Sequence, residues 1–396
     1  MTRRILIVGA GIVGSALAAG LAEVGQVSVT VLEAGPADQL PGSTGHAPGF
    51  VGLLNEAPVL TDLAVASVRR YEQCSRGAVP GFERVGGLEV ALTEAGLDEL
   101  HRRAALAGPA GLAARPLDAA QTVAQAPALI APRGCVGGVL YPEDGTARAD
   151  VITAALRDRA ARAGAHFVYQ TAVTALDIQD GRIHGARTGT AQFDANDVVL
   201  ACGIWGPVIA APAGLDLPLV PVEHPYVYGP VRERAGRTPF VRWPERHVYA
   251  RHHGERIGVG SYDHAPLPVD PADLGSGAQR PFRSDVFDPV IDRALELLPA
   301  SARFVPEHRL NGVFAMTPDN LPLLGPVADV PGLWVAAAIW VTHAAGAADA
   351  LAAMMTGQDP GVTELRALHP QRFRGEPRGE LRERALRRYR DIYATA

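Results

Sequence analysis

The residues Gly42 to Gly49 form the stretch of this sequence that is best arranged for chemistry. They read Gly-Ser-Thr-Gly-His-Ala-Pro-Gly, and three glycines with one proline predict a shaped turn rather than a helix. The turn carries one histidine, His46, a residue type that can move a proton, bind a ligand or act as a nucleophile. A histidine in such a loop is more often only solvated or hydrogen-bonded, so the rest of the chain has to decide between the two interpretations.

A glycine-rich fingerprint precedes this loop. An apolar run over residues 5–8 predicts a buried parallel strand, which leads into a GxGxxG turn and an alanine-rich helix. A second apolar strand, residues 27–32, ends at Glu33, where a carboxylate that binds a ribose belongs. The glycines permit a tight turn and close approach to a pyrophosphate, whose charge the helix N-terminus stabilises. The unit predicts a bound dinucleotide, NAD or FAD, held by Gly9, Gly11, Ile12, Val13, Gly14, Glu33 and Ala34.

Composition limits the classes of protein. A chain of 396 residues with 47% hydrophobic residues is too long for one ordinary core and predicts two domains. The formal net charge of −5 is mild, which disfavours nucleic acid or an anionic membrane as a partner. The most apolar later stretch, residues 333–355, contains His343 and Asp349, so we expect no membrane span. All 37 basic residues are arginine, which excludes mechanisms that need a lysine.

Cysteine usage and the C-terminal tail carry less information. Cys74, Cys135 and Cys202 lie far apart, without the spacing of a metal site or a CxxC motif. We therefore expect no disulfide framework, no metal and a reducing, cytoplasmic location. Residues 362–396 are rich in arginine and predict one helix, residues 380–393, whose charges we interpret as a solvated face.

The order of the elements predicts an α/β (α+β) fold with two interleaved domains. A strand over residues 86–92 leaves the nucleotide-binding half. A helix over 150–163, a hairpin across Asp180-Gly181 and an apolar strand over 197–202 then rebuild that half. We predict a Rossmann-like domain from residues 1–85, 140–219 and 310–396, and an antiparallel-sheet substrate domain from residues 86–139 and 220–309.

Histidines and tyrosines are concentrated in the predicted substrate domain. Nine of them lie between residues 224 and 264, mixed with prolines and arginines on expected strands. Rings that form hydrogen bonds suit the floor of a polar active site. For three of them, His252, His253 and His264, we favour a solvated sheet face. The arginines that are candidates to bind a substrate carboxylate are Arg242, Arg251 and Arg256, and the sequence favours none of them.

A last strand over residues 333–337 leads through Trp340 to His343 into a helix over 344–355. This helix is alanine and glycine on almost every face, so we expect another element to pack close to it. Its N-terminus is suited to face a ring on which negative charge develops.

Taken together, these motifs resemble the FAD-containing half of bacterial dimethylglycine oxidase and its relatives, the dimethylglycine and sarcosine dehydrogenases, in the D-amino-acid oxidase-like flavoprotein group. The resemblance covers nearly the whole chain, and we expect no counterpart here of the folate-binding module of those relatives. It rests on residues 9–14, 42–49, 86–91, 224–227, 249, 258–262, 311–325 and 340–343.

The resemblance implies roles for individual residues. The cofactor is FAD, and His46 matches the histidine that bonds covalently to the flavin 8α-carbon. His224 and Tyr249 match the catalytic pair that faces the flavin. Gly45 stands where relatives have a larger or polar residue, and we expect it to loosen the loop. The other cofactor-binding residues that the resemblance implies are Ser43, Thr44, Phe50, Val173, Gly203, Trp205, Ile339, Trp340, Val341 and Thr342.

The implied activity is FAD-dependent oxidation of the C–N bond of an N-methylated or secondary amino acid, similar to dimethylglycine or sarcosine. A neutral amine transfers hydride to flavin N5, and the iminium product hydrolyses. Because a distant cousin, monomeric sarcosine oxidase, activates oxygen with a lysine, the acceptor here is open between oxygen and an electron-transfer protein. Two alternatives remain: a flavin dehydrogenase for a larger amine in a specialised pathway, and a flavin-binding partner protein without turnover.

Overall fold

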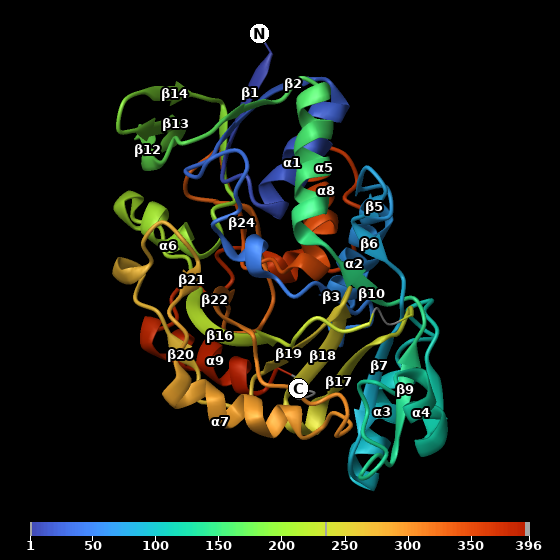
Figure 1. Ribbon diagram of the computed structural model, residues 1–396. Helices are drawn as coiled ribbons and strands as arrows, with labels where there is room; N and C mark the ends of the chain where they lie inside the picture. Colours follow the sequence, from blue (N-terminus) through green and yellow to red (C-terminus); the bar gives the residue numbers. More distant parts are fainter. Residues whose placement is uncertain (1, 234–235, 393–396) are drawn as a thin grey trace.

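A computed structural model describes residues 2–233 and 236–392, and its centre is a six-stranded sheet (Figure 1). Its strands pair in parallel except at the edge, where β23 runs antiparallel to β24. The inner strands are apolar on both faces, as expected for a parallel sheet that is covered on both sides. Across the sheet the order is β11 (His166–Val168), β2 (Val27–Leu32), β1 (Arg3–Val8), β15 (Asp197–Leu200), β24 (Leu333–Ala337) and β23 (Leu323–Pro326).

Three helices lie together beside this sheet: α1 (Ile12–Val24), α5 (Ala149–Arg162) and α8 (Ala344–Thr356) (Figure 1). Helix α8 also packs on α2 (Pro58–Tyr71). A Cβ atom added at Gly346 in α8 would lie 2.2 Å from the carbonyl oxygen of Leu63 in α2, so this approach requires glycine. The close neighbour expected from the alanine-rich composition of α8 is therefore confirmed.

A small three-stranded sheet contributes to a second apolar cluster on the central sheet. Its first two strands form the predicted hairpin, with Gln179 opposite Arg182. Asp180 and Gly181 both have positive φ, 50° and 74°, which a tight two-residue hairpin turn requires. The strands are β12 (Val173–Gln179), β13 (Arg182–Thr188) and β14 (Gln192–Asp194).

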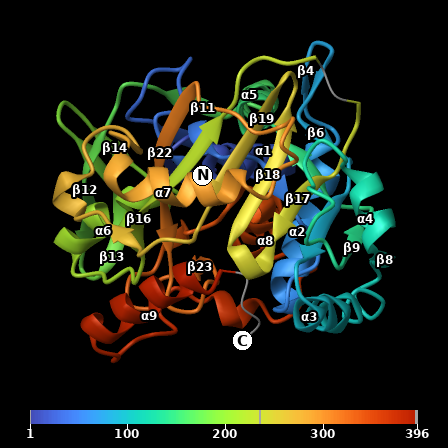
Figure 2. The ribbon, with the colours of Figure 1, turned by 60° about the horizontal axis from the view of Figure 1, so that its bottom comes forward.

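The second large sheet has ten strands and is mainly antiparallel, with β17 and β7 as a parallel pair. Helix α7 (Ser284–Leu295) crosses this sheet against β19, and α9 (Arg378–Arg390) packs on β16 and β22 (Figure 2). Across the sheet the order is β21 (Gln279–Arg280), β22 (His308–Met316), β16 (Val220–Tyr228), β19 (Arg256–Ser261), β18 (Val248–His253), β17 (Phe240–Trp243), β7 (Gly87–Ala91), β9 (Gly137–Tyr141) and β8 (Arg115–Asp118), while β20 (Leu267–Pro268) pairs with β16.

The remaining elements are mostly short, and most of them were not predicted. Strand β8 and helix α4 (Ala119–Gln125) fall in the region 108–138; the side chains of Asp118 and Gln121 form a capping box at the start of α4. The predicted helix 380–393 begins at Arg378 and ends at Arg390, and Tyr393 lies outside the described residues. The others are α3 (Glu94–Ala104), α6 (Gly206–Ala210), β3 (Phe50–Val51), β10 (Gly145–Ala147), β6 (Phe82–Glu83), β4 (Ser75–Arg76) and β5 (Val79–Pro80).

The combination of a mainly parallel sheet with a mainly antiparallel one confirms the α/β (α+β) fold class. The assignment of residue ranges to two domains stays a prediction. None of the helices in residues 2–233 and 236–392 is long and apolar enough to cross a membrane.

Candidate active site

A cavity of about 730 Å³ is lined by residues of both large sheets. Its lining includes the glycine-rich turn after β1 and side chains of β16 and β18. Every cofactor-binding residue predicted above lines this cavity except Gly14. A Cβ atom at Gly14 would lie 1.9 Å from the carbonyl oxygen of Gly9, so Gly14 serves the packing of α1 on the turn.

The glycine-rich turn is fixed by charged side chains. Glu33 accepts hydrogen bonds from the backbone N–H groups of Ala10 at 2.7 Å and Gly35 at 2.8 Å. Arg157 of α5 is buried, lines the cavity and donates to the carbonyl oxygen of Ala10 at 2.6 Å and of Ala37 at 2.9 Å. The sequence analysis missed Arg157. The available signal was an arginine on the apolar face of a predicted helix.

The loop that carries His46 is a single 3₁₀ turn, Ser43–His46, held at both sides. Thr44 Oγ1 accepts from the backbone N–H of Ile12 at 3.2 Å, at the N-terminus of α1, and Ser43 Oγ donates to the carbonyl oxygen of Val313 at 2.7 Å. A Cβ atom at Gly45 would lie 2.0 Å from the carbonyl oxygen of Leu40. The expectation that Gly45 loosens the loop is wrong, because glycine is what lets the loop close tightly.

The imidazole of His46 packs against strand β22, over Gly312. A Cβ atom at Gly312 would lie 2.4 Å from Cδ2 and 2.6 Å from Nε2 of the imidazole, so the ring occupies the space that a side chain would fill. Burial lowers the pKa of His46 to about 4, although a hydrogen bond with the backbone of Val313 acts in the opposite direction. The imidazole is therefore neutral at physiological pH, the form that acts as a nucleophile.

His224 and Tyr249, which both line the cavity, contact each other. His224 on β16 lies opposite Gly312 in the strand register, and its Nε2 is 2.6 Å from the hydroxyl of Tyr249 on β18. A Cβ atom at Gly260, on the strand between them, would lie 2.4 Å from Tyr249 Cζ, so glycine makes room for the tyrosine ring. The structure thus brings His46, His224 and Tyr249 to one cavity.

His224 has a second partner that the sequence analysis missed. Its Nδ1 is 2.8 Å from the hydroxyl of Tyr389 in α9, and this hydroxyl is 2.7 Å from Nε2 of His264. The interpretation of His264 as a solvated residue is wrong, and so is that of α9 as only a solvated face. Leu381, Ala385 and Tyr389 recur every fourth residue and bury one side of the helix.

The neighbouring rings form a second polar group. Nε2 of His253 is 2.8 Å from the hydroxyl of Tyr226, and its Nδ1 is 3.2 Å from Nη2 of Arg251. The solvated interpretation is therefore wrong for His253 as well, while His252 is half-buried. Arg251 is buried and donates to the carbonyl oxygen of Gly49 at 3.0 Å, so it supports the His46 loop.

The structure distinguishes between the three arginines that are candidates to bind a substrate carboxylate. Arg251 is occupied as described, and Arg256 pairs with Glu307 at 2.7 Å, whereas Arg242 lines the cavity. Arg103 of α3 also lines it and contacts both oxygens of Glu89, at 3.0 and 3.1 Å, while Arg242 lies 3.9 Å from the same carboxylate. Burial raises the pKa of the nearby Asp144 to about 7. This wall therefore carries the two guanidinium groups of Arg242 and Arg103 beside the carboxylates of Glu89 and Asp144.

The segment Trp340 to His343 covers another wall. Thr342 Oγ1 donates to the carbonyl oxygen of Phe50 at 3.1 Å, and the Tyr71 hydroxyl donates to that of Val341 at 2.6 Å. His343 lines the cavity, and burial lowers its pKa to about 4. Its Nε2 is buried and has no hydrogen-bond partner among the described residues. A polar atom in this state fits a wall that receives a polar ligand.

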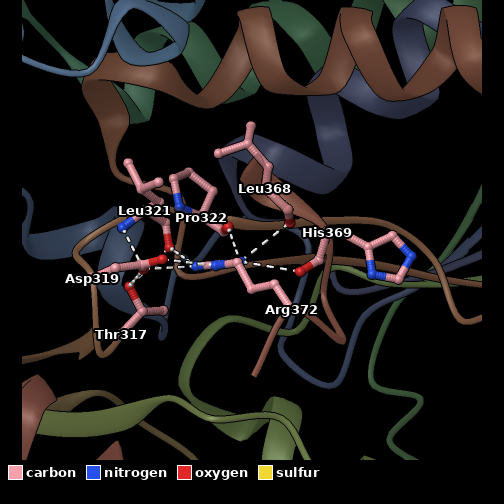
Figure 3. Close-up of polar contacts among 7 residues, drawn as sticks. All are labelled: Thr317, Asp319, Leu321, Pro322, Leu368, His369 and Arg372. Atoms are coloured by element: carbon pink, nitrogen blue, oxygen red, sulfur yellow. Dashed lines mark hydrogen bonds and ion pairs between the residues drawn. The ribbon is translucent and has the colours of Figure 1, made fainter. Parts of the chain in front are cut away.

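A loop between β22 and β23 completes the lining with Asn320 and Pro322. Figure 3 shows the polar contacts by which Arg372 holds this loop. Its guanidinium forms two bonds with Asp319, at 2.7 and 2.8 Å, and donates to the carbonyl oxygens of Leu321 and Pro322, both at 2.9 Å. The sequence analysis gave Arg372 no role.

The residues present fit a flavin dinucleotide. The turn with Gly9 and Gly11 suits a pyrophosphate, Glu33 suits a ribose, and neutral His46 and the unpartnered Nε2 of His343 lie along the same cavity. No group of three or more histidine, cysteine, aspartate or glutamate side chains in the described part of the chain is placed to hold a metal ion.

Curated proteins are similar to this chain in sequence. The chain is 27% identical to human (Homo sapiens) mitochondrial dimethylglycine dehydrogenase over 93% of its own length and 44% of that protein. It is 29% identical to 4-methylaminobutanoate oxidase (formaldehyde-forming) of Paenarthrobacter nicotinovorans, over 94% of the chain and 46% of that protein. It therefore spans less than half the length of these curated relatives.

Solved structures agree in fold. L-proline dehydrogenase from P. horikoshii superposes with a TM-score of 0.84 at 22% identity, over 96% of this chain and 99% of that one. Glycine oxidase from Geobacillus kaustophilus gives 0.79 at 25% identity, over 94% and 99%. The model of the family described as FAD dependent oxidoreductase (DAO) matches residues 4–354, from the first strand through most of α8. The predicted resemblance is confirmed at this level: the chain belongs to the DAO family of FAD dependent oxidoreductases.

Proposed function

We propose that this protein oxidises the C–N bond of an N-methylated or secondary amino acid, similar to sarcosine or dimethylglycine. The observation that carries the proposal is the His224–Tyr249 pair, joined at 2.6 Å in the cavity that also holds the His46 loop. When bound, FAD supplies the acceptor for a hydride from the carbon next to nitrogen. We propose that FAD contacts the same residues that the sequence analysis predicts as cofactor-binding.

The acid–base work falls to the chain. An ammonium group cannot give up hydride, because a proton occupies the nitrogen lone pair, so the amine has to be neutral when it reacts. Burial, with His264 and His46 nearby, lowers the pKa of His224 well below its usual range. His224 is therefore neutral, and its Nε2, 2.6 Å from the hydroxyl of Tyr249, is placed to pass on a proton rather than to hold it.

The substrate carboxylate is proposed to bind Arg242. Among the three arginines considered above, only Arg242 lines the cavity, and Arg103 beside it adds a second positive charge. A carboxylate at this wall would form charge-assisted hydrogen bonds, which hold the amine at a fixed distance. The relative that is named a 4-methylaminobutanoate oxidase supports a longer amino acid as the alternative substrate.

The covalent bond is proposed to run from His46 to the flavin. Support comes from its neutral imidazole and from the space that Gly312 leaves for the ring. The electron acceptor is oxygen or an electron-transfer protein. The three unpaired cysteines, Cys74, Cys135 and Cys202, are consistent with the proposed cytoplasmic location.

The test follows flavin absorbance after mixing with amines in the absence of oxygen. Sarcosine, dimethylglycine or 4-methylaminobutanoate should bleach the flavin. Matched amines without a carboxylate should bleach it about tenfold or more slowly, since a charged hydrogen bond contributes about 1.5–3 kcal/mol. Reduction by dithionite is the control for an accessible flavin. Flavin that dithionite bleaches, but that stays oxidised with every N-methylated amino acid, contradicts the proposal.

A further inference from the structure

We propose that Tyr249, His224, Tyr389 and His264 form a directed proton relay that carries the proton of a protonated amine from the cavity to the protein surface. This inference rests on the proposed amine oxidation. It assigns a function to α9, which lies beyond residue 354, where the match to the family model ends.

The four side chains form an unbroken line of short hydrogen bonds. The contacts are 2.6 Å from Tyr249 to His224, 2.8 Å from His224 to Tyr389 and 2.7 Å from Tyr389 to His264. Tyr249 and His224 line the cavity, His224 and Tyr389 are buried, and His264 is half-exposed between α9 and Phe287 of α7. The line therefore joins the site of reaction to solvent.

The donors and acceptors along this line have one consistent direction. Nδ1 of His264 is 2.8 Å from the carbonyl oxygen of Ala265, which can only accept, so Nδ1 carries the proton. In neutral His264, Nε2 then accepts from Tyr389, which in turn accepts from Nδ1–H of His224. Nε2 of His224 is left as the acceptor for Tyr249. Each hydroxyl or N–H thus donates away from the cavity.

A second acceptor for Tyr389 is present but weaker. Its hydroxyl lies 3.3 Å from the carbonyl oxygen of Glu223, compared with 2.7 Å to His264. The shorter contact is near the usual length for a hydroxyl donor, and the longer one is beyond it. The phenol proton therefore belongs to the bond with His264.

The surroundings of the two histidines favour a proton that moves on to His264 over a proton that stays on His224. His224 is enclosed by Tyr262 and Phe314 as well as by its two partners, and burial lowers its pKa. Burial also lowers the pKa of His264, but the carboxylate of Asp263, itself paired with Arg293 at 2.8 Å, acts to raise it. A positive charge is thus better tolerated at His264 than at His224.

The transfer balances as four linked steps. The ammonium proton passes to the Tyr249 oxygen while the Tyr249 proton passes to Nε2 of His224. The Nδ1 proton of His224 passes to Tyr389, whose own proton passes to Nε2 of His264. The amine becomes neutral, His264 becomes an imidazolium, and water at the surface then takes one proton. No oxidant or further reactant is needed.

The first test compares Tyr389→Phe and His264→Gln with wild type in the rate of anaerobic flavin bleaching at different pH. Phenylalanine keeps the ring of Tyr389 without its hydroxyl, and glutamine at position 264 still offers a hydrogen-bond acceptor without a titratable ring. We expect rates lowered about tenfold or more while the amine is an ammonium, and rates equal to wild type near pH 10, about where a free amine loses its proton. Tyr228→Phe, which changes a hydroxyl outside the relay, and His184→Gln, on the exposed side of β13, serve as controls.

A purely structural role of Tyr389 and His264 gives the same deficit at every pH, and that result overturns the relay. Wild-type flavin that no amine bleaches contradicts the proposed function instead. The relay is then still decided by ¹⁵N NMR of histidine-labelled protein without any amine. The expected signal is the Nδ1–H tautomer for both His224 and His264, and an Nε2–H tautomer for either residue overturns the proposal.

Discussion

At the scale of single residues, Gly312 sets the position of His46. The imidazole occupies the volume that a Cβ atom at Gly312 would need, with contacts of 2.4 Å to Cδ2 and 2.6 Å to Nε2. Real side chains do not approach so closely, so Gly312→Ala has to displace the ring. We expect the variant to bind FAD but to lose most of its covalent attachment, measured as flavin in the pellet after acid precipitation.

Two further variants serve as controls for this prediction. His46→Ala removes the nucleophile and should release all flavin to the supernatant. Gly189→Ala adds the same methyl group at a position with nothing within 4 Å, and it should leave attachment unchanged. If Gly312→Ala keeps the wild-type fraction of flavin in the pellet, the fit of His46 over Gly312 does not control attachment.

At the scale of elements, the loop Thr317 to Pro322 depends on Arg372. This guanidinium is largely buried and pairs with Asp319 while it binds several backbone carbonyls (Figure 3). Removing one partner of a buried pair leaves an uncompensated charge, so Arg372→Ala should lower the free energy of unfolding by about 3–5 kcal/mol. Urea unfolding measures the change.

Arg374 provides the matched control two residues away. It pairs with Asp329 at 3.1 Å, but its side chain is 68% exposed. Exposed pairs contribute only about 0–1 kcal/mol, so Arg374→Ala should change stability little. Equal losses in the two variants would mean that the bonds from Arg372 to the loop add nothing to its stability.

Local patterns predicted the elements whose partners are close in sequence. The GxGxxG turn, the strand that ends at Glu33 and the Asp180-Gly181 hairpin are each determined by residues within one unit, and each was found. Tyr389 and His224 are 165 residues apart, and no periodicity connects them. Arg372 and Asp319, 53 residues apart, lack a local signal for the same reason.

The errors at His253 and His264 have a common physical cause. Both follow polar or charged neighbours on expected strands, which is typical of a solvated face. What buries them in part is a ring or helix from elsewhere: Tyr226 beside His253, and α9 beside His264. Burial that comes from a distant segment is a tertiary property, and sequence alone did not show it.

At the scale of the whole molecule, buried histidines make stability depend on pH. Burial lowers the pKa of His343 to about 4 and those of His224 and His253 well below their usual range. At these histidines the unfolded chain therefore binds more protons than the native one below pH 6.5. The stability that neutral histidines contribute is complete above pH 6.5 and is lost as pH falls toward 4.

The size of the pH effect on stability follows from the difference in bound protons between the unfolded and the native chain. Asp144, with a pKa raised to about 7, has the opposite sign and offsets one histidine in this window. Each remaining excess proton lowers the free energy of unfolding by about 1.4 kcal/mol per pH unit. Urea midpoints of the FAD-bound protein should fall steadily from pH 6.5 to 5, and His343→Gln should flatten the slope by about one proton. Parallel curves for the variant and wild type would contradict this.

Helix α9 connects the last described part of the chain to the reaction site, since Tyr389 contacts His224 and Ile392 lines the cavity. During synthesis the sheets and the whole glycine-rich turn leave the ribosome before this helix does. Most of the residues that line the cavity can therefore assemble while the buried face of α9 is still in the exit tunnel. The relay through Tyr389 forms only after α9 has packed on β16 and β22, so the order of translation delays the processing of a protonated amine until this helix is in place.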